Sequence, residues 1–280
     1  MKKISRRSFL AAAAVSAAAL ALTACGGSAS TASSAAASSV AASSEAASTS
    51  AAAAELTTVE AGKLTMATNA TFPPYEMTTD AGTIEGIDVD TAQAIAEKLG
   101  LELQIDDMDF DAALLSVQQG KADIVMAGVT VTDERKAVMD FSDSYATGIQ
   151  SIIVPNDSEI ASPDDLAGKK IGTQRGTTGY IYCSDDFGED SVVAYDSGLT
   201  AVQALNNGQV DAVVIDNAPA TEYVAANPGL KVLDTSYAEE DYAIGMAKGS
   251  ALEDAVNKAL EELKADGTLQ AIVDKYINAN

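Results

Sequence analysis

The 280-residue sequence contains no histidine, only two cysteines and few basic residues. The lack of histidine excludes Ser-His-Asp and Cys-His catalytic sites, and also every zinc site that needs imidazole. Cys25 and Cys183 are too few for a disulfide framework or an all-thiolate zinc site. Acidic residues outnumber basic ones by 41 to 17, so the net charge of -24 disfavours nucleic acid as a partner. The length suits one large or two modest domains.

Long hydrophobic runs are also absent, apart from a short one near the N-terminus. Four basic residues precede an apolar stretch at 9–22, which is too short to span a bilayer comfortably and has the length of a signal-peptide core. It runs into Leu22-Thr23-Ala24-Cys25, which resembles a bacterial lipobox. We therefore expect a lipoprotein signal peptide at 1–24 and lipidation of Cys25. A plain secretory signal with a chance cysteine is the alternative.

Residues 5–10 contain Arg6 and Arg7 and resemble a twin-arginine export motif, although an ordinary basic n-region fits equally well. Either route places the protein outside the cytoplasm. Removing residues 1–24 deletes four basic and no acidic residues, which takes the net charge from -24 to -28.

Residues 25–56 are predicted to form a flexible tether after the lipidated cysteine. Alanine and serine make up most of residues 26–56 (13 and 10 of 31), and this composition buries too little apolar surface to offset its ordering entropy. A lipid followed by a spacer would hold the folded part near a membrane.

Strand-like and helix-like patterns alternate from about residue 62, which is typical of α/β folds with parallel strands. We expect strands at 64–67, 101–105, 122–127 and 242–248, and helices at 89–99, 110–119, 251–264 and 269–277. We expect the C-terminal helices to return to the first half of the fold.

The chain repeats one pattern at an offset of 88 residues. Residues 112–128 and 200–216 both read as an amphipathic helix, a G-x-x-D turn and a short apolar strand. The turns are Gly120 to Asp123 and Gly208 to Asp211. Two similar lobes would bring several strand ends to one cleft, where open α/β sheets bind ligands. A G-x-x-D can also be a common helix-to-strand turn.

The loop after the first repeat carries groups suited to a carboxylate. Ala127 and Gly128 allow close backbone approach, and Thr132 is a predicted N-cap of a helix whose amide end favours anions. Arg135 supplies a planar guanidinium that matches a carboxylate. By itself, this pattern also fits a surface arginine on a capped helix.

This loop and several other segments closely resemble the polar amino-acid binding proteins of ABC importers, solute-binding protein family 3. The resemblance covers about residues 60–280, and its motifs occur in the family's order. They are Asn69-Ala-Thr-Phe72-Pro-Pro-Tyr75-Glu76, Gly86-Ile-Asp88-Val-Asp90, Met108-Asp-Phe110, Asp140-Phe141-Ser142-Asp143, Gly172-Thr-Gln-Arg-Gly176-Thr-Thr178 and Asp216.

The resemblance implies a two-lobed α/β fold of the type II periplasmic-binding-protein class. Each lobe would hold a mainly parallel sheet flanked by helices, and a two-strand hinge would join them across the ligand cleft. The expected boundaries are 57–148 and 241–280 for lobe 1 and 149–240 for lobe 2. The implied function is an importer's extracytoplasmic binding component, a monomer without enzymatic activity, cofactor or metal, which delivers its ligand to a membrane permease.

The resemblance also implies residue roles. Arg135, with amides near Thr130 and Thr178, would bind the ligand α-carboxylate, and Asp216 with Gly128 would bind the α-ammonium. Phe72 and Phe110 would sandwich the ligand. The complete implied site is Asn69, Phe72, Phe110, Ala127, Gly128, Thr130, Arg135, Gln174, Thr177, Thr178, Ile215 and Asp216.

Each role has a structural alternative. The two phenylalanines could be core aromatics, Asp216 could only cap a helix beginning near Ala218, and the threonines could be turn residues. Asp88, Asp90 and Asp140 read as helix-cap or surface acids, and Cys183 as a buried thiol.

The predicted ligand has an uncharged polar or moderately apolar side chain. Asn69, Gln174 and Ile215 bring no charge to the pocket, which leaves glutamine-like, cystine-like and small neutral amino acids open. A sensor domain of the same fold is an alternative function. A dehydratase is another, although it would need a cleft carboxylic acid in place of histidine.

Overall fold

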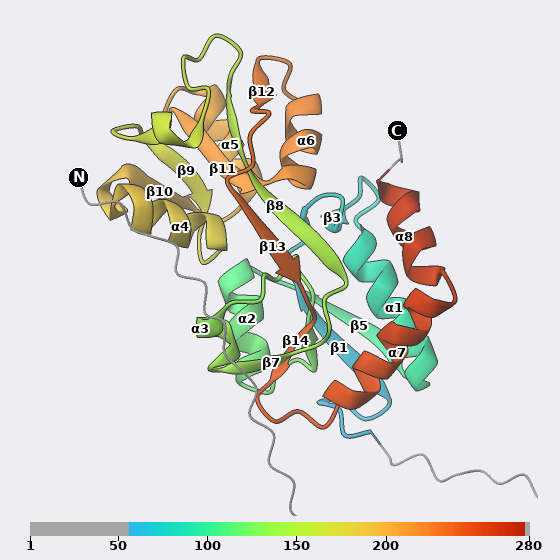
Figure 1. Cartoon of the computed structure of the whole chain (residues 1–280). Helices are drawn as coiled ribbons and strands as arrows, with labels where there is room; N and C mark the ends of the chain where they lie inside the picture. The colour runs from blue at the N-terminus through green and yellow to red at the C-terminus, as the bar shows by residue number, and fades with distance from the viewer. Residues whose placement is uncertain (1–55, 278–280) are drawn as a thin grey trace, which may run out of the picture. The chain divides into compact units, whose positions relative to one another are not determined.

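A computed structural model describes residues 56–277 (Figure 1). The predicted signal peptide, Cys25 and all of the tether except its last residue lie outside the described residues. Among the helices that are described, none combines the length and the apolarity needed to cross a bilayer.

The first sheet has five strands in the order β5-β1-β6-β14-β7. Parallel pairing joins β5, β1 and β6, whereas β14 is antiparallel to both of its neighbours. The strands are β1 (Lys63–Thr68), β5 (Glu102–Asp107), β6 (Ile124–Val125), β7 (Met139–Phe141) and β14 (Gly245–Ala247).

The second sheet has six strands, with the order β10-β9-β11-β8-β12 and β13 paired to β8. Again three strands are parallel, β10, β9 and β11, and the pairs made by β8 are antiparallel. The strands are β8 (Ala146–Pro155), β9 (Ile171–Gln174), β10 (Val192–Tyr195), β11 (Ala212–Asp216), β12 (Leu230–Val232) and β13 (Ala238–Tyr242).

Helices cover both faces of each sheet, and a small third sheet lies beside the first. The third sheet is β2 (Thr71–Phe72), β3 (Glu76–Thr78) and β4 (Ile84–Glu85). The helices are α1 (Ile87–Leu99), α2 (Phe110–Gln118), α3 (Asp133–Lys136), α4 (Thr178–Phe187), α5 (Gly198–Asn206), α6 (Asn217–Ala225), α7 (Glu253–Ala265) and α8 (Thr268–Tyr276), with short 3₁₀ turns at Pro163–Leu166 and Glu189–Ser191.

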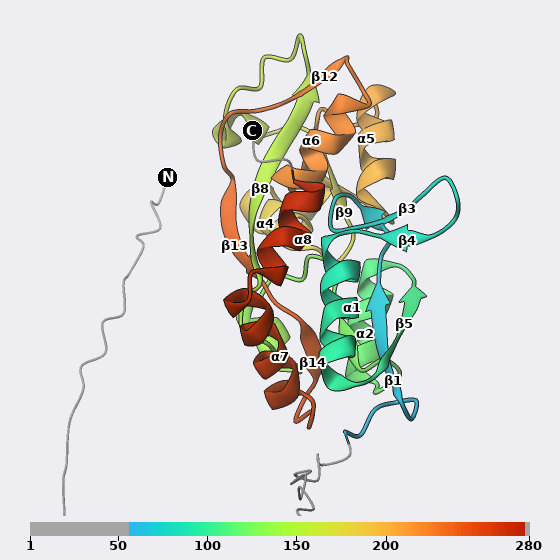
Figure 2. The same ribbon diagram turned by 90° about the vertical axis from the view of Figure 1, so that its right-hand side faces the viewer.

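The alternation of side chains along the strands explains this layering. In β1, Leu64 and Met66 pack against α1, α7 and α8, whereas Ala67 packs on the other face with α2. Figure 2 shows α1, α7 and α8 near one another. In β11, Val213 and Ile215 face α5 and α6, and Val214 faces α4. Each sheet is therefore the middle layer of its own lobe, and the α/β two-lobed prediction is confirmed. The expectation that each sheet is mainly parallel is wrong, because β14 and β8 bring antiparallel pairs into the two sheets.

Cys183 of α4 belongs to the core beneath the second sheet. It is a free thiol with no exposed surface, and burial raises its pKa to about 12. The prediction of a buried thiol is confirmed.

Two strands of the second sheet, β8 and β13, lie where the chain passes between the lobes. They pair antiparallel from Ala146 opposite Tyr242 to Gln150 opposite Ala238, and Figure 1 shows them running side by side toward the first sheet. The single strand predicted at 242–248 is wrong. β13 ends at Tyr242 in the second sheet, and β14 begins at Gly245 in the first, because the chain changes lobe between them.

The repeated G-x-x-D has the same structural role in both lobes. Gly120 and Gly208 adopt left-handed backbone (φ 65° and 66°) that ends the preceding helix. Asp123 then donates its N–H to the carbonyl of Thr65, and its carboxylate accepts the N–H of Thr65 at 2.7 Å. Asp211 makes the same reciprocal pair with Lys170, at 2.8 Å for both bonds. The motif therefore fastens the start of β6 to the neighbouring strand β1, and the start of β11 to the start of β9.

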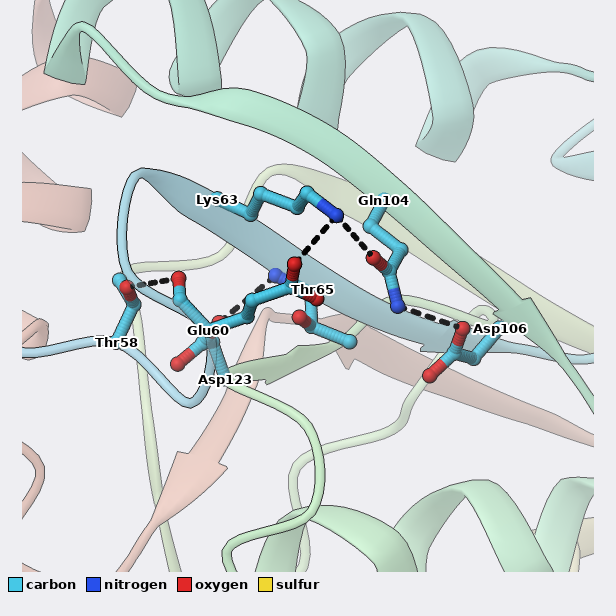
Figure 3. A network of polar contacts seen from close by, with 7 residues as sticks. All are labelled: Thr58, Glu60, Lys63, Thr65, Gln104, Asp106 and Asp123. Atoms are coloured by element: carbon cyan, nitrogen blue, oxygen red, sulfur yellow. Dashed lines mark hydrogen bonds and ion pairs between the residues drawn. The ribbon is translucent and has the colours of Figure 1, made fainter.

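Asp123 has one further partner near the start of the described residues. Its second carboxylate oxygen accepts the N–H of Val59 at 2.7 Å. Lys63 pairs with Glu60 at 2.6 Å and donates to Gln104 on β5 at 3.2 Å (Figure 3). The segment that leads into β1 is thus fastened to the first sheet.

Candidate functional site

One cavity is lined by residues from both lobes, and it lies where strands of the two sheets end. Asn69 follows β1, Ala127 and Gly128 follow β6, Gln174 ends β9, and Asp216 ends β11. Its lining includes all twelve residues predicted from the sequence, together with Glu76, Gln150, Val214 and Tyr242. Four parallel strands therefore deliver their carboxyl ends to one place, as open α/β sheets do at their ligand sites.

Arg135 reaches the cavity from the short helix α3. The hydroxyl of Thr132 accepts the N–H of Arg135 at 3.2 Å, so the predicted N-cap is confirmed. The side chain is buried (9% exposed) and donates from Nη1 to the carbonyl of Thr130 (2.7 Å) and from Nη2 to the carbonyl of Gly176 (3.1 Å). These carbonyls come from different lobes. Within residues 56–277, no carboxylate forms an ion pair with Arg135.

Burial makes Arg135 a strong anion site. Desolvation lowers the pKa of Arg135, and the nearby carboxylate of Glu240 opposes that change. A buried guanidinium remains charged because its reference pKa is so high. Its guanidinium carbon also lies 5.4 Å from the ring centre of Phe110, so cation and aromatic ring are in contact.

Asp216 supplies a negative charge from the other lobe. It is 2% exposed and accepts three hydrogen bonds, from Ala218 N (3.1 Å), Ile149 N (2.8 Å) and the hydroxyl of Tyr242 (2.7 Å). Burial raises its pKa to about 6, and the three donors oppose the shift. Asp216 therefore caps α6 and lines the cavity at the same time.

Two phenylalanines, Phe72 and Phe110, line the cavity. Phe72 on β2 stacks on Tyr75 (5.8 Å between ring centres) and is half-buried, whereas Phe110 begins α2 and is almost fully buried. Gly128 has φ +56°, and a Cβ there would lie 2.8 Å from Cε1 of Phe72. Glycine is thus required where this loop passes the ring.

Amide and hydroxyl groups line the remaining wall. Nε2 of Gln174 donates to Oδ1 of Asn69 at 2.9 Å across the two lobes. Thr177 caps α4 through a bond from Tyr180 N, and the hydroxyl of Thr178 lies 3.4 Å from that of Thr130.

Sequence reasoning missed the role of two buried acids. Glu76 on β3 has no exposed surface and lines the cavity, and no other described residue donates a hydrogen bond to its carboxyl oxygens; its hydrogen-bonding neighbour is the carboxyl group of Asp88. Burial and the neighbouring Asp88 raise its pKa well above the usual range. Glu76 pairs with Phe72 in the β2–β3 ladder, a relationship that only the fold makes visible.

The reading of Asp88 as a helix-cap or surface acid is wrong. It is fully buried, accepts the N–H of Gly128 (3.0 Å) and the hydroxyl of Tyr145 (2.7 Å), and holds the Gly128 loop. Its pKa is raised to about 6, chiefly by burial. Asp90 and Asp140, by contrast, pair with Lys275 and Lys248 near the surface.

Comparisons with known proteins agree with this geometry. The family described as bacterial extracellular solute-binding proteins, family 3, matches residues 64–279. An L-cystine-binding protein, TcyJ, of Escherichia coli K12 is 34% identical over 79% of this chain and 85% of its own. Among solved structures, the arginine-, lysine-, histidine-binding protein ArtJ of Geobacillus stearothermophilus is 35% identical, with a TM-score of 0.75 over 78% of this chain and 96% of that one.

An ancestral arginine-binding protein bound to glutamine is 42% identical, with a TM-score of 0.72 over 77% of this chain and 98% of that chain. These relatives are named as binding proteins rather than enzymes. With the family match covering most of the sequence, the chain belongs to the bacterial extracellular solute-binding proteins, family 3.

Proposed function

We propose that this protein is the extracytoplasmic binding component of an ABC importer and that it carries a free amino acid. The observation that supports this most strongly is the pairing of opposite charges in one cavity. Arg135 comes from one lobe, Asp216 from the other, and both are buried. A zwitterion matches both charges, and it offsets the desolvation cost of each group only when the lobes are together. Closure then follows from tighter binding in the closed arrangement.

The twelve predicted residues would share this work. Arg135 and the amides of Thr130 and Thr178 would bind the α-carboxylate, and Asp216 and Gly128 would bind the α-ammonium. The rings of Phe72 and Phe110 would enclose the ligand, while Asn69, Gln174, Thr177, Ile215 and Ala127 would complete the pocket.

We propose that the ligand side chain carries N–H donors. The expectation of an uncharged side chain rested on Asn69, Gln174 and Ile215, and did not include Glu76. Glu76 shares a hydrogen bond with Asp88, but no described residue donates to its carboxyl oxygens, and this favours a ligand that does. The amide of glutamine and the guanidinium of arginine share this chemistry. The names of the relatives, which include cystine, arginine and glutamine, are compatible with both.

The same proposal covers the rest of the chain. Residues 57–148 and 241–280 would form lobe 1 and residues 149–240 lobe 2, with β8 and β13 as the hinge. Residues 1–24 would be a signal peptide, and Cys25 would carry the lipid that holds a monomer at the membrane beside its permease.

A titration panel tests the proposal. The purified protein is titrated calorimetrically with the common amino acids and cystine, and thermal shift provides a second readout, since ligand at 100 times its dissociation constant stabilises by about 2.7 kcal/mol. Tight binding of arginine, glutamine or both is expected. Arginine alone would indicate an ionised Glu76, and glutamine alone a protonated one. No binding by any amino acid would overturn the proposal.

A further inference from the structure

Two buried side chains lie on the same face of the connecting strand β13. Glu240 and Tyr242 are two residues apart, which places them on one face of a strand. They are 6% and 1% exposed, whereas Glu239 and Asp241 between and beside them are exposed. Buried carboxyl and hydroxyl groups are normally hydrogen-bonded, so both side chains should have hydrogen-bond partners.

Tyr242 is hydrogen-bonded to Asp216, the acidic residue of the proposed charge pair. Its hydroxyl donates to Oδ2 of Asp216 at 2.7 Å, and Ile149 of the paired strand β8 donates its N–H to the same oxygen. Gly148 leaves space for this contact. A Cβ there would lie 2.7 Å from that Asp216 oxygen and 2.5 Å from Cζ of Tyr242. The connecting strands are thus shaped around the Tyr242–Asp216 bond.

Glu240 contacts Thr130, the residue whose carbonyl holds Arg135. Its Oε2 accepts from the hydroxyl of Thr130 and from Nε2 of Gln150, both at 3.0 Å. The carbonyl of the same Thr130 accepts from Arg135. A carboxylate only accepts, so the Thr130 proton is directed at Glu240, and Thr130 Oγ1 is left to accept from the Thr178 hydroxyl of the other lobe.

We infer that Glu240 and Tyr242 are positioning residues that fasten the Arg135 and Asp216 halves of the site to one strand and so fix the spacing of its two charges. This inference rests on the proposed function, because the two charges matter as a pair only for a zwitterionic ligand.

The two residues act on Asp216 with opposite signs. The titratable groups that face Asp216 are Tyr242, Glu240 and Tyr75, and Arg135 and Glu76 line the same cavity. Burial raises the pKa of Asp216 to about 6, the hydroxyl of Tyr242 lowers that pKa, and the negative charge of Glu240 raises it. Only ionised Asp216 binds an ammonium group, so ligand affinity should fall as pH drops through its pKa.

The test measures the dissociation constants of L-arginine and L-glutamine calorimetrically from about pH 5 to about pH 8. Tyr242→Phe keeps the ring and loses the hydroxyl, so the pH midpoint of affinity should rise by about one to two units. Glu240→Gln keeps the shape and loses the charge, so the midpoint should fall below that of the wild type.

Two variants serve as matched controls. Tyr237→Phe removes another tyrosine-to-aspartate bond, to Asp186 in lobe 2, and Glu239→Gln neutralises an acid on the exposed face of β13. Both should keep the wild-type midpoint.

An unchanged midpoint in Tyr242→Phe, or shifts of the two variants in the same direction, would overturn the inference and leave the binding function in place. If the unaltered protein bound no amino acid at any pH, the proposed function itself would be overturned.

Discussion

Nε2 of Gln174 in the second lobe donates a hydrogen bond to Oδ1 of Asn69 in the first lobe at 2.9 Å. Gln174 ends β9 and Asn69 follows β1, so this bond joins the ends of strands from two different sheets across the cavity. Asn69 also donates to the carbonyl of Met108 at 2.8 Å, which fixes its amide orientation and makes its oxygen the acceptor. This wall of the cavity consists of oriented amides. Charge recognition therefore falls to Arg135 and Asp216.

Removal of Arg135 should weaken binding strongly. Arg135→Ala leaves the ligand carboxylate in a dry cleft without its cation, and we expect a loss of about 2–5 kcal/mol. Arg135→Lys should lose much of the same amount, since an ammonium group cannot form two parallel bonds to a carboxylate. Isothermal titration calorimetry measures both.

Arg175→Ala is the matched control, because Arg175 is exposed and its pairing with Asp196 at 3.6 Å lies on the surface. Its affinity should equal that of the wild type. Wild-type affinity in Arg135→Ala would remove the carboxylate clamp.

Glu76 should discriminate between ligands. Glu76→Gln replaces an acid that can ionise by an amide that cannot, so arginine binding should weaken about tenfold or more, whereas glutamine binding changes less. Competition between arginine and glutamine for the variant measures this ratio. Glu102→Gln, an exposed change on β5, is the control. An equal loss for the two ligands would mean that Glu76 does not contact the side chain.

Asp216 should make stability depend on pH in the opposite sense to most carboxylates. Its pKa of about 6 lies above the usual value of 3.8, so the folded state holds its proton more tightly than the unfolded state. The folded state is therefore favoured at low pH, and this contribution is lost as pH rises from about 4 to about 6.

The side chain introduced by Asp216→Asn cannot ionise, so the variant does not lose this stability as pH rises. Between about pH 4 and about pH 7, the unfolding free energy of the variant minus that of the wild type should therefore increase by up to about 3 kcal/mol. Urea denaturation of both proteins at several pH values, without ligand, gives this difference. A constant difference across that range would contradict the raised pKa.

Cys183 should be chemically silent in the native protein. The thiol has no exposed surface, and its pKa of about 12 leaves almost no reactive thiolate at neutral pH. Mass spectrometry after iodoacetamide treatment should find Cys183 labelled only when denaturant is present. Rapid labelling under native conditions would show that α4 opens readily.

The sequence predicts the residues that line the cavity because many of them directly follow or end a predicted strand. The helix and strand alternation, the paired Gly120 and Gly208 turns and the loop before Arg135 each depend on neighbours close in the chain. The lipid site at Cys25, the lobe boundaries and the ligand roles remain predictions.

Features that join distant segments were not predictable in this way. Nothing local distinguishes Glu76 or Asp88 from a surface acid, since their burial depends on packing with Tyr145 and the Gly128 loop. The contacts of Glu240 with Thr130 and of Tyr242 with Asp216 join residues that are far apart in the sequence, so only the fold reveals them. For the same reason, the change of sheet between Tyr242 and Gly245 reads as one continuous strand in the sequence.

The fastening of Val59 to Asp123 has a mechanical consequence. Any tension arriving from the upstream chain is taken up by the first lobe, where β1 lies between two parallel neighbours and resists by shear along several hydrogen bonds at once. The chain itself passes from the first lobe to the second and back at β8 and β13. In the lipid-anchored protein proposed above, the first lobe would therefore stay stationary while the second lobe moves.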